Sequence, residues 1–217
     1  MTNFQVLEIF CTRSQQRLQA SRQHYESRKD SNLLDRLRKE LSGDLERLCV
    51  KLLSENRHNN NFDAERIATE LYAHGEGKWG TNEAGFIDVF AGNSQSQLLQ
   101  VAEAYERQYK NSLLAAIKSE FSGSMKTALT YLLMDDVDLT CKLLKKATID
   151  KIGTNEAVVN RCIGGHDKKG VQEIARRFFR YAHQLNVARC QDPDDSYGYV
   201  SHYLGIMMAF CGLAYCG

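Results

Sequence analysis

Apolar residues recur every three or four positions along most of this chain, which is the spacing of one face of an α-helix. The pattern is clearest between residues 62 and 134, where Leu98, Val101 and Tyr105 form one such stripe. We predict five helices in this region: 62–74, a helix that follows Thr81 and runs through Phe90, 95–109, 111–120 and 124–134.

Local signals mark the ends of these helices. Thr81 is expected to be the N-cap of the second helix, because a threonine hydroxyl can accept a hydrogen bond from a free backbone N–H. Ser122 and Gly123 interrupt the chain between the fourth and fifth helices. The chain holds a single proline, Pro193, so little in it opposes helix formation. The sequence therefore predicts an all-α protein.

The helical pattern repeats along the chain. Shifted by 80 residues, VLEIF at 6–10 aligns with FIDVF at 86–90, and ELSG at 40–43 aligns with EFSG at 120–123. Shifted by 73 residues, GTNEA at 80–84 meets an identical GTNEA at 153–157. Self-similarity at such a period is typical of stacked helical repeats. A polar, asparagine-rich segment at 54–61 and an acidic pair at 135–136 separate three copies, which we place at 1–54, 62–134 and 137–217.

Two motifs at fixed spacing resemble the repeat of the annexin family: G-T-N-E at the start of the second helix, and an acidic residue followed by x-S-G after the fourth. The copy at 62–134 matches that repeat over its whole length, and its loop GEGKWGTNE is similar to the longer loop of the annexin third repeat. The resemblance implies an annexin-like array of five-helix repeats, about two and three-quarter of them here. The copy at 1–54 lacks the leading helix and the calcium loop of such a repeat.

The resemblance also implies a calcium site in the copy at 62–134. Its ligands would be the backbone carbonyls of Gly75, Lys78 and Gly80 together with the carboxylate of Glu120. These are the hard oxygen ligands that calcium prefers, and with roughly 6–8 positions to fill the ion would keep about two for water or lipid oxygens. A secondary metal site would use the Thr81 carbonyl and Glu83. A plain helix–turn–helix joint, with glycine and threonine as caps, is the alternative interpretation of this loop.

The other two copies carry weaker signals. Glu40 keeps the acidic position of the first copy but has no partner loop, which favours a structural role. In the third copy, Gly153 and Asp192 are weak metal candidates, because Lys151 stands where the family usually has a glycine. The sequence therefore predicts one complete loop-and-carboxylate pair.

From this resemblance we expect calcium-dependent binding to acidic phospholipid membranes of the phosphatidylserine type. Lys78 would attract anionic headgroups, and Trp79 at the loop tip would be exposed and contact the membrane, since a tryptophan ring suits the membrane–water interface. The protein would be cytoplasmic, and peripheral on the inner face of membranes when calcium rises. The alternative is a helical-repeat scaffold that binds a protein partner or the cytoskeleton without calcium. No catalytic constellation is present, so an enzyme is not expected.

Composition and charge narrow the range of partners. With 28 basic and 27 acidic residues the net charge is +1, so no strong field favours nucleic acid. The first residues lack the pattern of a secretory signal, and the seven cysteines are expected to be reduced and mostly buried. The apolar segment Tyr203–Gly217 is too short to span a bilayer and is expected to be a buried terminal helix, or else a lipid-inserting tail.

Two further surfaces could bind partners. Without a preceding repeat, an apolar face around Phe4, Leu7 and Phe10 is expected to be exposed, and the chain could self-associate or bind a protein partner through it. Arg176, Arg177 and Arg180 are interpreted as a solvated helix face, with an acidic partner as the alternative.

Overall fold

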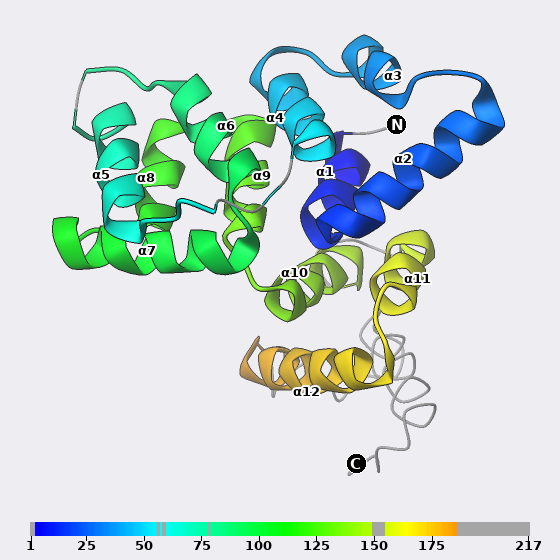
Figure 1. The fold of residues 1–217 in the computed structure, drawn as a ribbon. Coiled ribbons are helices and arrows are strands. Elements are labelled where there is room, and N and C mark those ends of the chain that lie inside the picture. Colours follow the sequence, from blue (N-terminus) through cyan, green and yellow to red (C-terminus); the bar gives the residue numbers. More distant parts are fainter. Residues whose placement is uncertain (1–2, 56, 58–59, 78, 149–154, 186–217) are drawn as a thin grey trace. The chain divides into compact units, whose positions relative to one another are not determined.

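The computed structural model describes residues 3–55, 57, 60–77, 79–148 and 155–185. All of the regular structure in these residues is α-helical, as predicted (Figure 1). The helices are α1 Asn3–Thr12, α2 Gln15–Lys29, α3 Leu33–Glu40, α4 Gly43–Ser54, α5 Ala64–His74, α6 Glu83–Gly92, α7 Gln95–Tyr109, α8 Leu113–Glu120, α9 Gly123–Leu132, α10 Asp136–Thr148, α11 Glu156–Gly164 and α12 Lys168–Leu185. The chain divides into two compact units, Met1–Met134 and Asp135–Gly217.

The 80-residue repeat is present in the positions of the helices. Helices α1 to α4 begin 80 residues before α6 to α9, one for one. The caps repeat as well: the side chains of Ser14 and Ser94 both accept the backbone N–H three residues on, where α2 and α7 begin. Gly43 and Gly123 both have a positive φ, at +64° and +55°, where α4 and α9 begin. Similar local sequences thus give similar turns in the first two copies. The boundaries of all three copies, at 1–54, 62–134 and 137–217, remain a prediction.

Helix α5 packs on α7 in the second copy, and the contact is both aromatic and polar. The rings of Tyr72 and Tyr109 stack with their centroids 3.9 Å apart. Glu65 accepts hydrogen bonds from the side chains of Arg107 and Gln108. Side chains from α5, α6, α7, α8 and α9 are buried inside this bundle. The first copy has no described helix that corresponds to α5.

The expected exposed apolar face at the start of the chain is not found. Leu7 and Phe10 are only 3% and 6% exposed. Helix α1 packs on α9, where the Cys11 thiol lies 3.8 Å from the Ala128 carbonyl oxygen. The neighbouring copy therefore covers apolar residues of α1 that we expected to be exposed. The side chain of Phe4 lies outside the described residues.

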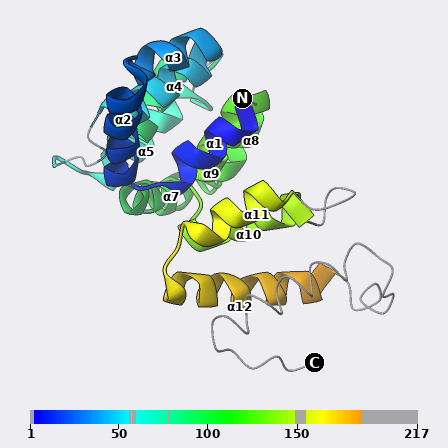
Figure 2. The same ribbon diagram turned by 90° about the vertical axis from the view of Figure 1, so that its right-hand side faces the viewer.

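Helices α10, α11 and α12 form the described part of the second unit, with α12 running beside α10 (Figure 2). Arg177 on α12 contacts Asp135, which directly precedes α10, at 3.0 Å and Asp138 in the first turn of α10 at 2.8 Å. The interpretation of Arg177 as part of a solvated face is therefore wrong, because this side chain joins two helices. Arg176 and Arg180 are exposed, as expected.

The cysteines follow expectation where they are described. The free thiols of Cys11, Cys49, Cys141 and Cys162 are all buried. Burial raises the pKa of Cys49 to about 12, so its thiol stays protonated at neutral pH. Within the described residues, no helix is long and apolar enough to cross a bilayer. Tyr203–Gly217 lies outside the described residues.

Candidate functional site

The loop between α5 and α6 is closed by backbone hydrogen bonds at its base. The N–H of Gly75 donates to the carbonyls of Leu71 and Tyr72, at 3.1 and 3.2 Å, where α5 ends. The N–H of Gly77 donates to the Tyr72 carbonyl at 2.8 Å. At the far end of the loop, the N–H of Asn82 donates to the carbonyl of His74 at 2.7 Å. The two ends of the loop are thereby held together.

Asn82, not Thr81, is the N-cap of α6. Its side-chain oxygen accepts the N–H of Gly85 at 3.3 Å, and its side-chain nitrogen lies 3.1 Å from Nδ1 of His74. Asparagine is at least as good a cap as threonine, and the backbone bond to His74 places it at the helix start. The prediction that Thr81 caps this helix is therefore wrong, and the Thr81 hydroxyl is used elsewhere.

The Thr81 hydroxyl donates to Oε2 of Glu120, which joins the loop to the last residue of α8. A Cβ placed on Gly75 would lie 3.4 Å from Cγ of Glu120, so the other end of the loop also reaches this side chain. Gly80 has a φ of +82°, a conformation that other residues adopt only with strain. Thr81 and Glu120 therefore meet although they lie 39 positions apart in sequence. That the loop and this carboxylate hold calcium stays a prediction.

Aromatic packing holds the end of α8 against this loop. Phe121, the residue after Glu120, contacts the ring of Phe86 on α6 edge-on, with the centroids 4.9 Å apart. Phe86 is 1% exposed and also lies against Gly75. Glu120 itself is only partly buried.

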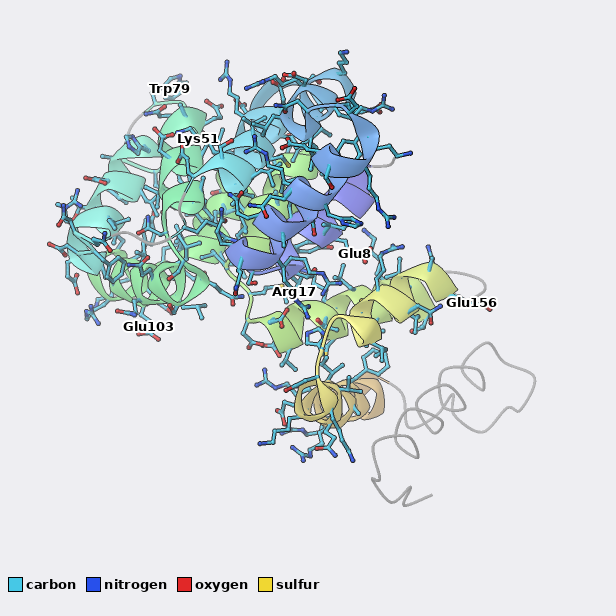
Figure 3. All side chains as sticks on the ribbon, turned by 45° about the vertical axis from the view of Figure 1, so that its right-hand side comes forward. Glu8, Arg17, Lys51, Trp79, Glu103 and Glu156 are labelled. Atoms are coloured by element: carbon cyan, nitrogen blue, oxygen red, sulfur yellow. The ribbon has the colours of Figure 1, made fainter. Side chains whose placement is uncertain are left out.

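Trp79 extends from the loop with its whole side chain exposed, as expected (Figure 3). Glu83 is the first residue of α6 and is also exposed. Lys78 lies outside the described residues, so its predicted membrane contact stays a prediction. Gly153 and Asp192 lie outside them as well.

Glu40 differs from Glu120 in its surroundings, although the two residues end equivalent helices. Its carboxylate pairs with Arg36 at 2.7 Å, one turn back on the same helix. Within the described residues, no group of three or more His, Cys, Asp and Glu side chains could hold a metal ion. A cation at Glu120 would therefore need backbone carbonyls beside the one carboxylate.

Glu76 is a residue that the sequence reasoning missed. It lies inside the loop, where Tyr105 and Asn111 donate to its carboxylate at 2.6 and 2.8 Å. The only sequence signal was an acidic residue within a loop already singled out for its glycines. Nothing in the linear sequence indicates that α7 places a tyrosine hydroxyl there.

The annexin family model matches residues 2–52 and 66–132 of the chain. "Annexin A7" of Dictyostelium discoideum is 38% identical over 128 residues, which is 57% of this chain and 28% of that protein. "Annexin A7" of Xenopus laevis is 30% identical over 205 residues, 88% of this chain and 39% of that protein. A solved structure of a point mutant of annexin A8 with an intact N-terminus has a TM-score of 0.74 at 28% identity, covering 83% of this chain and 59% of that chain.

The chain thus spans less than two thirds of the length of each of these proteins. The family model nevertheless matches more than half of the chain, in two segments that correspond to α1–α4 and to the bundle α5–α9. Three features of the structure agree with this match: the array of helical repeats, the loop that precedes α6, and the acidic residue at the end of α8. This chain belongs to the annexin family.

Proposed function

We propose that this chain binds acidic phospholipid membranes of the phosphatidylserine type in a calcium-dependent manner, through the loop 75–81 and Glu120. The observation that carries the proposal is the position of Glu120, whose Cγ lies near Gly75 and whose carboxylate accepts a hydrogen bond from the Thr81 hydroxyl. Family membership gives independent support, because calcium-dependent binding to phospholipid is the general property of annexins.

The residues present fit a calcium ion. The carbonyls of Gly75, Lys78 and Gly80 and the carboxylate of Glu120 are hard oxygen donors, which calcium prefers. The hydroxyl of Thr81 uses only part of the acceptor capacity of Glu120, since an ionised carboxylate has about four lone-pair sites. A secondary site at Thr81 and Glu83 is part of the same proposal.

A bound calcium ion would also accept phosphate or carboxylate oxygens of lipid headgroups as ligands, in addition to the oxygens of the protein. The loop itself offers two further contacts with a membrane. Trp79 is exposed and presents a ring that is favoured at the membrane interface. Lys78 would add attraction for anionic headgroups. Calcium and lipid then bind cooperatively, and each raises the affinity for the other by the same factor.

The proposed setting is the cytoplasmic side of cell membranes, where anionic lipids give the surface a negative potential. The protein would be peripheral there and released when calcium falls. Binding by a single carboxylate predicts weak calcium affinity in the absence of lipid, because few ligand charges offset the dehydration of the ion.

Co-sedimentation with vesicles that contain phosphatidylserine tests the proposal. The full chain should sediment with vesicles in calcium and be released by a chelator. Glu120→Gln should raise the calcium concentration for half-maximal binding by roughly tenfold or more, because it removes the only charged ligand.

Glu40→Gln is the matched control. It changes an equivalent helix end that has no described loop beside it, so its calcium requirement should equal that of the wild type. Equal requirements for Glu120→Gln and the wild type would refute the site. Binding that ignores calcium would instead support the calcium-independent scaffold.

A further inference from the structure

Glu76 connects the loop to two other elements of the bundle. Its Oε2 accepts the hydroxyl of Tyr105 on α7 at 2.6 Å, and its Oε1 accepts the side-chain N–H of Asn111, between α7 and α8, at 2.8 Å. Hydrogen bonds to a charged acceptor are about twice as strong as neutral ones. Both oxygens of Glu76 are therefore engaged by residues outside the loop.

Tyr105 is a rigid anchor for this contact. Its side chain is 1% exposed, and its ring lies 5.1 Å from Tyr109 and 6.3 Å from Tyr72, measured between centroids. Burial, together with the hydrogen bond to Glu76, raises the pKa of Tyr105 far above its ordinary value. The hydroxyl therefore remains a donor throughout the physiological pH range.

We propose that Glu76 is a positioning residue that orders the described part of the loop, residues 75–77 and 79–81, before calcium arrives, by fixing it to Tyr105 and Asn111. The inference rests on the proposed calcium function of the same loop. Without this contact, the loop would lose conformational entropy when the ion binds, and this loss would oppose binding. A loop ordered in advance avoids part of that cost.

The third copy of the chain agrees with a link between Glu76 and Tyr105. In the third copy, Ile149 and Phe178 stand at the corresponding positions, so the carboxylate and the hydroxyl are both replaced by apolar side chains. The first copy keeps Tyr25 at the position of Tyr105 but has no corresponding loop in the chain. Only the second copy has both members of the pair.

A role of Glu76 as a direct calcium ligand makes a different prediction. If Glu76 were released to bind the ion, losing the tyrosine hydroxyl would leave calcium affinity unchanged or increase it. If Glu76 positions the loop, losing the hydroxyl should decrease calcium affinity. Tyr105→Phe separates the two roles, because it removes one oxygen from α7 and leaves Glu76 intact.

The experiment compares Tyr105→Phe with Tyr25→Phe in the full chain. The first variant should need about fivefold to tenfold more calcium for half-maximal binding to phosphatidylserine vesicles. In the absence of calcium, the amides of residues 75–81 should exchange hydrogen faster than in the wild type. Tyr25→Phe should change neither quantity.

The unfolding temperature of Tyr105→Phe, measured without calcium, shows whether the substitution only destabilises the fold. If Tyr105→Phe lowers this temperature while the calcium requirement and the loop amides stay as in the wild type, the positioning role is refuted. A calcium requirement that stays the same or decreases also refutes it. If wild-type binding ignores calcium, the proposed function fails and the calcium role of Glu76 fails with it.

Discussion

At the scale of single residues, Trp79 is the side chain best placed to report on the loop. It is the only tryptophan in the chain, and it is fully exposed although it is the largest apolar side chain available for burial. Burying a large apolar side chain stabilises a folded protein by about 1.5–3 kcal/mol, and an exposed ring does not contribute this free energy. That cost is recovered if the ring reaches a membrane interface, where an aromatic ring with one polar N–H is favoured.

The fluorescence of Trp79 should therefore follow membrane binding directly. In calcium-free protein we expect the emission of a water-exposed indole. Calcium together with phosphatidylserine vesicles should shift the emission to shorter wavelength, because the ring leaves water. Vesicles made only of phosphatidylcholine provide the control and should give no shift. A shift of equal size with both kinds of vesicle would contradict the proposed lipid preference.

The residues of the site show what sequence can and cannot predict at this scale. Gly80 and Glu120 lie in short motifs that repeat at a fixed offset, whereas Gly75 was singled out through the resemblance to the annexin loop. The role of all three residues as calcium ligands stays a prediction. The role of Thr81 was predicted wrongly, since Thr81 and Asn82 are adjacent and both suit an N-cap. The choice between them depends on the hydrogen bonds of Asn82 to His74 and of Thr81 to Glu120, which join separate segments.

At the scale of elements, α2 and α7 show how one pattern adapts to two environments. Val101 and Ala104 on α7 are fully buried in the bundle in which α5 packs on this helix. Their counterparts on α2 are Ser21 and His24, and both are exposed. The two equivalent helices therefore have the same length and a serine N-cap but differ on one face. On α7 that face carries apolar side chains, because another helix packs on it. On α2 the corresponding side chains are polar and exposed to solvent.

Arg177 connects α12 to the start of α10 through ion pairs. Its guanidinium contacts Asp135, Asp138 and Glu173, so one cation serves three carboxylates. The hydrogen bond from Arg177 is the largest cause of the lowered pKa of Glu173. For Asp135, burial raises the pKa, but hydrogen bonds from Asp138 and Arg177 outweigh this effect and lower it.

These shifts give the stability of the second unit a defined dependence on pH. A carboxyl group with a lowered pKa stabilises the folded state above its ordinary pKa, here 3.8 for Asp135 and 4.5 for Glu173. That stabilisation is lost as the pH falls through the lowered values. Arg177→Met should decrease the unfolding free energy by about 1 kcal/mol at neutral pH and weaken this acid dependence.

Arg176→Met is the matched control for this element. Arg176 is exposed and contacts only Glu173 on its own helix among the described ion pairs, so its loss should change stability by less than about 0.5 kcal/mol. Thermal unfolding of both variants, followed from neutral pH down to about pH 3, checks the comparison. Equal stability of the two variants across this range would contradict the role given to Arg177.

At the scale of the whole molecule, the fold was predictable because it is repetitive. Self-comparison placed α6 to α9 relative to α1 to α4 without any knowledge of packing. It could not show which apolar residues one copy covers on another, so Leu7 and Phe10 were expected to be exposed and are buried. Burial of this kind depends on contacts between α1 and α9, which are far apart in sequence.

The two compact units should respond differently to calcium. The proposed site lies within Met1–Met134, whereas the weak candidates Gly153 and Asp192 belong to the unit Asp135–Gly217. A ligand stabilises the part of a protein that binds it, by about 2.7 kcal/mol at a concentration of 100 times its dissociation constant. Amide exchange of the full chain with calcium and vesicles should therefore slow in residues 75–81 and 113–121 and stay unchanged in α10 to α12.

Two variants locate the principal site within the molecule. Asp192→Asn should preserve the calcium-induced protection of residues 75–81 and 113–121, because Asp192 belongs to the other compact unit. Glu120→Gln should abolish that protection, since it removes the carboxylate that the loop shares with α8. Calcium-induced protection that appears in α10 to α12 instead, and that disappears in Asp192→Asn but survives Glu120→Gln, would place the principal site in the third copy, at Gly153 and Asp192.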